Sequence, residues 1–133
     1  DAWDGGDLGK NVLLGKRKGA HGAGEWAPPG GHLEFGETFA DAARKEVEEE
    51  TGLTIDDIEL FLVDNNLRYA QSDGKHYVTL SFRTAHVGGT PEVREPEKCE
   101  RWEWFALDAL PSPLAEFAAH ALARITASGI AAK

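Results

Sequence analysis

The alternation of apolar and polar positions predicts several short strands along the chain. Residues 11–15 (NVLLG) form an apolar run typical of a buried strand. Residues 58–70 and 75–87 flank the turn-forming residues QSDG, and their composition predicts a β-hairpin. Residues 101–107 (RWEWFAL) predict one more strand near the end of the chain.

Two segments have the periodicity of helices. The first, at residues 38–50, follows a Gly- and Pro-rich loop at residues 19–37. Thr38 is the expected N-cap of this helix, and Gly52 stands where a C-cap belongs. The second helix follows the residues PSP and continues towards the C-terminus. Strands mixed with two helices predict an α/β or α+β architecture, in a single domain over residues 1–133.

Charge and composition exclude several classes of partner. The net charge of −9 disfavours binding to a nucleic-acid polymer, although a divalent ion could still recruit a small phosphorylated ligand. The single cysteine, Cys99, cannot form an internal disulfide, which favours a reducing compartment. No apolar run approaches the ~20 residues of a membrane span. We therefore expect a cytoplasmic protein without a membrane partner.

The first predicted helix carries a group of acidic residues whose role is open. At about 100° per residue, Glu46, Glu49 and Glu50 fall within or beside its apolar arc, whereas Glu48 falls on the solvated face. Partly burying a carboxylate is costly unless it is paired or binds a metal. Oxygen ligands from one helix suit a hard cation such as Mg²⁺. On helix geometry alone, a solvated acidic face and a metal site remain equal alternatives.

The loop before this helix, PPGGHLEFGE, extends the pattern into a longer motif. Residues 31–53 resemble the signature of the Nudix hydrolase family, G-x5-E-x7-R-E-U-x-E-E-x-G-U, in which U is aliphatic. The matching residues are Gly31, Glu37, Glu46, Val47, Glu49, Glu50, Gly52 and Leu53. Lys45 replaces the arginine of the signature. The stretches HYVTLSF and EPEKCERWEW also resemble the MutT-like branch, whose members cleave nucleoside triphosphates.

This resemblance implies both a fold and an activity. The fold would be an α/β/α sandwich around a central mixed β-sheet. The activity would be hydrolysis of a nucleoside triphosphate, canonical, methylated or oxidised, to the monophosphate and pyrophosphate. Mg²⁺, or Mn²⁺ in its place, would be held by Glu46, Glu49, Glu50 and the carbonyl of Gly30. Glu49, Glu50 or an acid from the loop before the last strand would act as general base, and the sequence does not decide which.

Further roles follow from the same resemblance. Glu37 would form an ion pair with Lys45 and so orient Glu46. An acid from the loop before the last strand would complete the metal site, and we favour Glu100 over Glu97 for this role.

Three residues are candidates for substrate binding, each with a structural alternative. His32 could hydrogen-bond a phosphate or simply stabilise its loop. Lys16, together with its neighbours Arg17 and Lys18, could attract an anionic ligand, although basic residues after a strand are usually solvated. Tyr77 could stack on a base or belong to the core.

Two departures from the family pattern leave other readings open. Lysine lacks the planar fork of arginine, so Lys45 predicts reduced rather than absent turnover. Residues 1–10 show no clear strand where the family has one, and an open sheet edge favours pairing with a partner chain, which makes a homodimer plausible. The alternative functions are cleavage of another diphosphate, such as a sugar nucleotide, dinucleotide or prenyl diphosphate, or weakly catalytic nucleotide binding.

Overall fold

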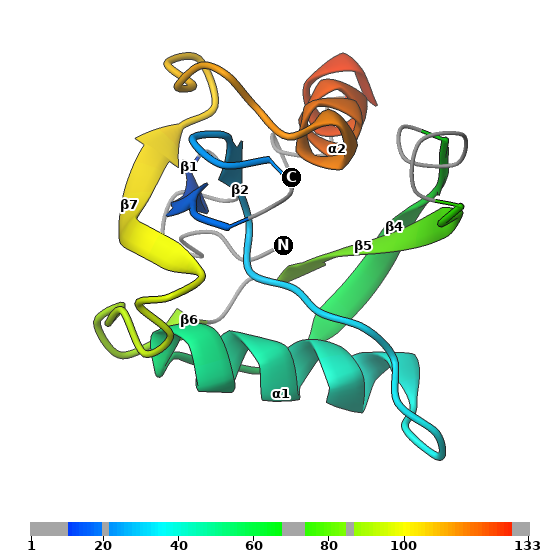
Figure 1. The fold of residues 1–133 in the computed structure, drawn as a ribbon. Coiled ribbons are helices and arrows are strands. Elements are labelled where there is room, and N and C mark those ends of the chain that lie inside the picture. The colour runs from blue at the N-terminus through cyan, green and yellow to red at the C-terminus, as the bar shows by residue number, and fades with distance from the viewer. Residues whose placement is uncertain (1–10, 20–21, 68–73, 85–86, 129–133) are drawn as a thin grey trace.

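The computed structural model describes residues 11–19, 22–67, 74–84 and 87–128 (Figure 1). Within these residues the chain forms seven strands and two helices. They are β1 (Asn11–Arg17), β2 (Trp26–Ala27), α1 (Phe39–Thr51), β3 (Thr54–Ile55), β4 (Ile58–Asn66), β5 (Tyr77–Thr84), β6 (Val87–Gly88), β7 (Cys99–Ala106) and α2 (Glu116–Ser128).

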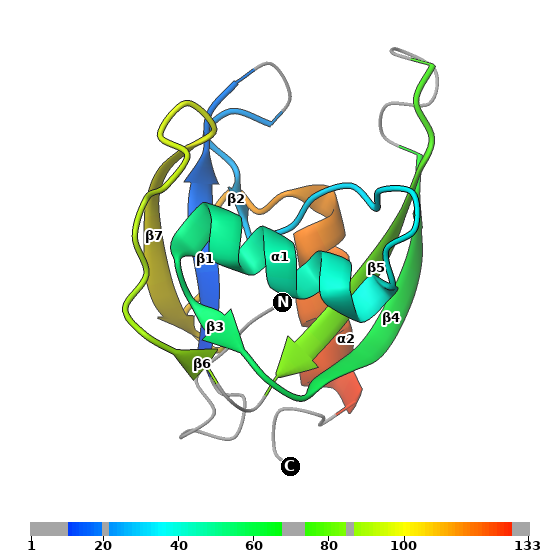
Figure 2. The same cartoon turned by 90° about the horizontal axis from the view of Figure 1, so that it is seen from below.

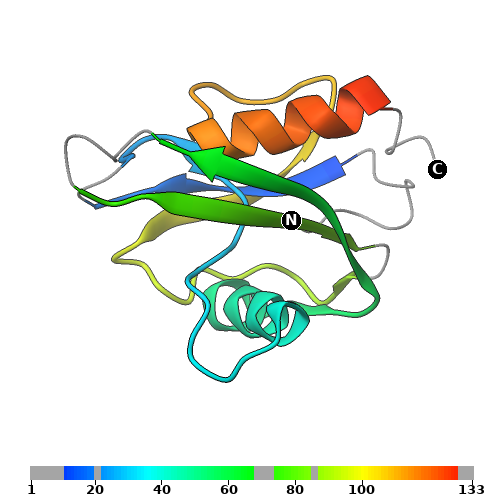
Figure 3. The same cartoon turned by 90° about the vertical axis from the view of Figure 1, so that its right-hand side faces the viewer.

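The strands lie in a layer between the two helices, with α2 on one side and α1 on the other (Figure 3). This arrangement confirms the expected α+β fold. The described strands pair in three antiparallel sheets, β2-β1-β7, β3-β6 and β4-β5, rather than in one mixed sheet. Parallel pairing among the described residues is limited to an isolated bridge between Trp26 and Leu114.

Both predicted caps of α1 are present. The hydroxyl of Thr38 accepts a hydrogen bond from the backbone N–H of Asp41 at 3.1 Å, which satisfies one unpaired donor of the first turn. Gly52 ends the helix in the left-handed conformation with φ of 77°, and its N–H donates to the Glu48 carbonyl at 2.8 Å. The predicted helix boundaries therefore agree with the structure to within one residue.

The core lies on both faces of β1, because successive side chains of a strand point to opposite sides. Val12 and Leu14 pack towards α2, where they meet Trp26, Leu122 and Ile125. Leu13 packs on the other face with Val47, Leu53 and Ile55. Figure 2 shows α1 crossing β1, with β7 on one flank and the β4-β5 hairpin on the other. The packing of Val47 thus fixes the last turns of α1 over the sheet.

Some strand predictions differ from the structure at their ends. β1 continues through the basic residues to Arg17, and β7 begins at Cys99 rather than at Arg101. The hairpin of β4 and β5 is confirmed by their register. Most of its predicted turn lies outside the described residues, as do residues 1–10. Neither helix is long and apolar enough, over the described residues, to cross a membrane.

Candidate functional site

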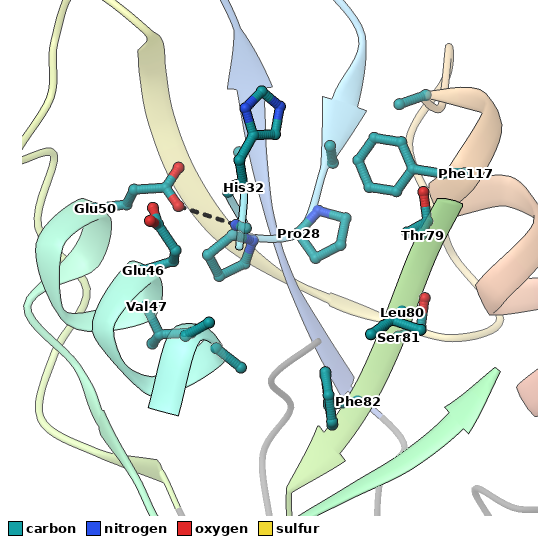
Figure 4. Close-up of a pocket in the computed structure, with 18 of the residues that line it drawn as sticks. Pro28, His32, Glu46, Val47, Glu50, Thr79, Leu80, Ser81, Phe82 and Phe117 are labelled. Atoms are coloured by element: carbon teal, nitrogen blue, oxygen red, sulfur yellow. Dashed lines mark hydrogen bonds between the residues drawn. The ribbon is translucent and has the colours of Figure 1, made fainter. Parts of the chain in front are cut away.

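A cavity of about 740 Å³ opens between α1, the loop after β2, β5 and the start of α2. This volume lies within the range of small-molecule sites, roughly 300–1,000 Å³. Figure 4 shows Glu46 and Glu50 on one side of the cavity and Thr79 and Phe117 on the other. The predicted helix and two elements distant in sequence therefore form one site.

Glu46 and Glu50 supply the acidic wall of the cavity, one helical turn apart on α1. Burial raises the pKa of Glu50 to about 8, and the charge of Glu46 adds to this effect while the Gly30 N–H opposes it. Burial also raises the pKa of Glu46, and repulsion from Glu49 adds to it. Glu49 itself is exposed and does not line the cavity. Two of the three predicted carboxylates therefore line the cavity, and the third is exposed outside it.

The paired glycines of the loop allow it to approach α1 closely. The backbone N–H of Gly30 donates to Oε2 of Glu50 at 2.9 Å (dashed line in Figure 4). A Cβ atom on Gly31 would lie only 2.3 Å from the carboxyl carbon of Glu46, so a larger residue would displace that side chain. The amide of Gly30 thus contacts the site directly, whereas its carbonyl was the group expected to bind metal.

The predicted ion pair between Glu37 and Lys45 is present. Lys45 Nζ lies 2.7 Å from Glu37 Oε2 and 3.4 Å from Glu34 Oε2. The hydrogen bond from Lys45 lowers the pKa of Glu37, and the N–H of Glu34 lowers it further. The same hydrogen bond raises the pKa of Lys45. Lys45 therefore ties the loop to the helix immediately before Glu46, although it does so without an arginine fork.

The loop before β7 contributes Glu95, which sequence analysis missed. Glu95 and Lys98 line the cavity, and the charge of Glu95 helps to raise the pKa of Glu46 and Glu50. The favoured residue, Glu100, does not line the cavity. It lies 3.8 Å from Lys16 and 3.6 Å from Arg101 in ion pairs on the protein surface.

The alternative, Glu97, is exposed and does not line the cavity. A signal for Glu95 was present in the residues EPEK, which are typical of a turn. The carbonyl of Glu95 accepts hydrogen bonds from the N–H groups of Lys98 and Cys99. Glu95 opens this turn and lines the cavity, the next two residues do not line it, and Lys98 returns to it.

Two of the three substrate-binding candidates line the cavity, and the third does not. His32 and Tyr77 both line the cavity and stack on each other, with ring centroids 5.6 Å apart and an interplanar angle of 22°. Lys16 does not line the cavity, because its side chain turns towards Glu100. Its neighbours Arg17 and Lys18 line the cavity instead. The basic cluster therefore lines the site through Arg17 and Lys18, two of its three predicted members, and not through Lys16.

The wall opposite the carboxylates is polar and aromatic, and the sequence pattern did not indicate it. Asn66, Thr79 and Ser81 line it from the hairpin, and Phe117 from α2. Asn66 is almost fully buried, donates to Asp64 Oδ2 at 3.1 Å and accepts from the hydroxyl of Thr79. These groups offer hydrogen bonds and an aromatic face, which together suit a heterocycle.

The donor set of the acidic wall fits a hard divalent cation. Glu46 and Glu50 are partly buried, and among the described residues neither forms an ion pair. Burial and repulsion from other carboxylates raise both pKa values. Carboxylate oxygens are the ligands that Mg²⁺ prefers, and a bound cation would offset both effects. In the described part of the chain, no three acidic, cysteine or histidine side chains are already arranged as a closed metal site. The wall is therefore an open platform, to which a substrate phosphate could add further oxygen ligands.

Comparisons with known proteins agree with this geometry. A family model described as the NUDIX domain matches residues 4–125. The crystal structure of a MutT NUDIX hydrolase from Burkholderia pseudomallei superimposes with a TM-score of 0.82 at 36% identity, covering 87% of this chain and 88% of that one.

Two further relatives extend the comparison. The mouse oxidized purine nucleoside triphosphate hydrolase is 36% identical over 102 residues, which cover 77% of this chain and 62% of the relative. The ADP-ribose pyrophosphatase of Methanocaldococcus jannaschii is 34% identical over 103 residues, covering 75% of this chain and 57% of the relative. This chain therefore spans less than two thirds of the length of either relative.

Proposed function

Because this chain belongs to the Nudix family, we propose that it is a divalent-metal-dependent hydrolase of nucleoside triphosphates. The products would be the nucleoside monophosphate and pyrophosphate, and an oxidised purine nucleotide is the favoured substrate. Mg²⁺ is the proposed ion, with Mn²⁺ as its substitute. The observation that carries this proposal is the pair of partly buried carboxylates, Glu46 and Glu50, on the wall of a nucleotide-sized cavity.

A bound metal would neutralise phosphate oxygens and lower the pKa of an attacking water. Glu46 and Glu50 would hold the ion, Glu49 would reach it from the rim, and Glu95 would serve in place of the expected Glu100. The Gly30 N–H orients the Glu50 carboxylate by its 2.9 Å hydrogen bond. The ion pair of Glu37 with Lys45 holds the loop against α1, one residue before Glu46. Catalysis would then rest mainly on positioning and charge stabilisation.

The polar wall supports a nucleotide with a heterocyclic base. The amide of Asn66 and the hydroxyls of Thr79 and Ser81 can exchange hydrogen bonds with a base edge, and Phe117 offers a stacking surface. Arg17 and Lys18 add positive charge at the cavity for an anionic substrate. The mouse relative's name specifies oxidised purine nucleoside triphosphates, which is why we place these first.

A second candidate is the cleavage of another diphosphate, and ADP-ribose is its best representative. The specific observation in its favour is the 34% identity to an ADP-ribose pyrophosphatase. A cytoplasmic location and a homodimer stay predictions from the sequence.

The test is pyrophosphate and phosphate release from a panel of canonical and oxidised nucleoside triphosphates, with ADP-ribose included, in the presence of Mg²⁺. The panel is run on the parent protein, on Glu46→Gln and on Glu48→Gln. We expect pyrophosphate release by the parent protein and a loss of about a hundredfold or more in kcat for Glu46→Gln. Glu48→Gln is the matched control, because it makes the same change on the same helix at an exposed position outside the cavity.

Equal losses in Glu46→Gln and Glu48→Gln would contradict the assignment of the acidic wall. Cleavage of ADP-ribose without cleavage of any triphosphate would replace the first candidate by the second. Absence of turnover with every substrate would leave nucleotide binding without catalysis, and would overturn the proposed activity.

A further inference from the structure

The last turn of α1 presents an electrostatic problem. It carries three consecutive acids, Glu48, Glu49 and Glu50, and no basic residue. The C-terminal end of a helix holds the negative end of its dipole, where cations stabilise and carboxylates destabilise. A positive charge at this end must therefore come from elsewhere in the fold.

Arg94, which lies 42 positions after Gly52 in the sequence, supplies this charge. Its Nη1 donates to the Glu48 carbonyl at 3.4 Å, and its Nε lies 3.1 Å from Oε1 of Glu92. The guanidinium also lies directly against the helix end, since a Cβ atom on Gly52 would fall 2.8 Å from both Nε and Nη2. Gly52 thus has a second role besides its left-handed conformation, because its missing side chain gives the guanidinium room.

The backbone around Arg94 is bound to the same helix end. The N–H of Glu92 donates to the Thr51 carbonyl at 2.8 Å, and the N–H of Arg94 donates to the Glu50 carbonyl at 3.2 Å. The segment 92–94 therefore satisfies carbonyls that the end of α1 leaves unpaired. Two backbone hydrogen bonds and one guanidinium fix it against the helix.

The next residue along the chain is Glu95, whose side chain lines the cavity with Glu46 and Glu50. Its carbonyl accepts hydrogen bonds from the N–H groups of Lys98 and of Cys99, the first residue of β7. Glu95 is therefore held between two anchors, the end of α1 on one side and the start of β7 on the other. A shift of the first anchor would move Glu95 relative to the carboxylates of α1.

We propose that Arg94 is a positioning residue of the active site, which acts on the bound ion through Glu95. It touches neither substrate nor metal, and it clamps the segment before Glu95 onto the end of α1. This proposal rests on the proposed function in one respect, namely that Glu95 takes part in holding the ion. The loop acid and the helix acids then form one site because segment 92–94 joins their two backbones, and the guanidinium of Arg94 adds a side-chain contact to the two backbone hydrogen bonds.

The test is a double-mutant cycle on divalent-ion affinity, measured by titration calorimetry with Mn²⁺ in the absence of nucleotide. Its variants are Arg94→Gln, Glu95→Gln and the combination of both, studied well below their melting temperatures. We expect each single change to weaken the ion affinity about tenfold, as is typical of groups that orient metal ligands. The double variant should be no weaker than Glu95→Gln alone, because Arg94 acts through Glu95.

The matched control is Arg44→Gln, which removes an exposed arginine of α1 that lies 3.4 Å from Asp41 and outside the cavity. It should leave the ion affinity unchanged. If Arg94→Gln does not fold, the same cycle is run with Arg94→Lys, which keeps the charge but lacks the planar fork.

Each result separates the two proposals. Additive losses in the double variant would show that Arg94 acts independently of Glu95, and would overturn this inference alone. An unchanged affinity in Arg94→Gln would overturn it as well. An unchanged affinity in Glu95→Gln would remove Glu95 from the ion site, and the inference with it. Failure of the parent protein to hydrolyse any nucleotide would contradict the proposed function, while the ion-binding cycle could still be read.

Discussion

The two helices have equal length, 13 residues each, but differ in how many side chains they bury. α2 buries Ala118, Ala121, Leu122 and Ile125 against the sheet. α1 buries only Val47 and Thr51, and most of its remaining residues are charged or small. α2 is thus a packing element, whereas α1 is held by few buried contacts and presents carboxylates to the cavity. The helix that contributes less to the core is the one that carries the carboxylates proposed to bind the ion.

The same contrast appears within the acids of the α1 region. Glu37 is satisfied, because Lys45 and the Glu34 N–H both stabilise its charged form and lower its pKa. Among the residues that the structure describes, Glu46 and Glu50 have no such ion-pair partner, and burial together with repulsion from neighbouring carboxylates raises their pKa. Perturbed carboxylates in a cavity are characteristic of functional sites. Paired acids here stabilise the loop, and unpaired acids mark the place where a cation would act.

The largest expected effect on stability comes from truncating the packing helix. Ile125→Ala removes a fully buried side chain of the core cluster and should lower the free energy of unfolding by about 2–4 kcal/mol. The remaining folded protein should keep its kcat at low temperature, because Ile125 does not line the cavity. Urea unfolding and steady-state kinetics test the two statements. The control is Arg124→Ala, which changes the exposed neighbouring position. A loss of kcat in Ile125→Ala would contradict the view that α2 serves packing and α1 serves the site.

A smaller effect should appear in the pH dependence of the metal-free protein. The pKa of Glu50 in the folded state is about 8, above the usual value of 4.5, so between these values the folded state binds a proton that the unfolded state has lost. Stability from this group is therefore complete below about pH 4.5 and is lost as the pH rises through about 8. We expect a difference of about 1–2 kcal/mol in unfolding free energy over this window, after allowing for partial hydration.

The measurement compares the melting temperature of the parent protein with that of Glu50→Gln from pH 5 to pH 9, without divalent ions. The glutamine keeps an acceptor for the Gly30 N–H but cannot ionise, so its melting temperature should fall less as the pH rises. Adding Mg²⁺ at pH 8.5 should raise the melting temperature of the parent protein and not that of the variant. Parallel pH curves for the two proteins would show that Glu50 is not desolvated.

The smallest expected effect concerns Lys45, which pairs with Glu37 and directly precedes Glu46. Lys45→Arg should raise kcat a few fold, because a planar fork can hold Glu37 with two hydrogen bonds where lysine now contacts Glu37 and Glu34 separately. Steady-state kinetics at saturating Mg²⁺ provide the test. Arg44→Lys, the reverse exchange at an adjacent exposed position, should change nothing, and an unchanged or lower kcat in Lys45→Arg would contradict the expectation.

The sequence by itself determined α1 and its two caps, because N-cap, C-cap and helical period are local properties. It also placed Glu46 and Glu50 on the inner side of the helix, since angular position follows from spacing alone. The ion pair of Glu37 with Lys45 followed from the resemblance to the Nudix signature. The strand centres were predictable for the same local reason, while strand ends such as Arg17 and Cys99 depended on the partner strand.

The tertiary structure alone decided which distant residues join these acids. Glu95, Glu97 and Glu100 cannot be distinguished from the sequence. The hydrogen bonds of segment 92–94 to the end of α1, and the turn before β7, hold Glu95 at the cavity. Lys16 leaves the site for the same kind of reason, an ion pair with Glu100. The polar wall of Asn66 and Thr79 exists only because the hairpin packs beside α2. Local geometry, such as a helix face or a cap, follows from residue spacing. Contacts between segments far apart in the chain depend on tertiary packing, which residue spacing does not determine.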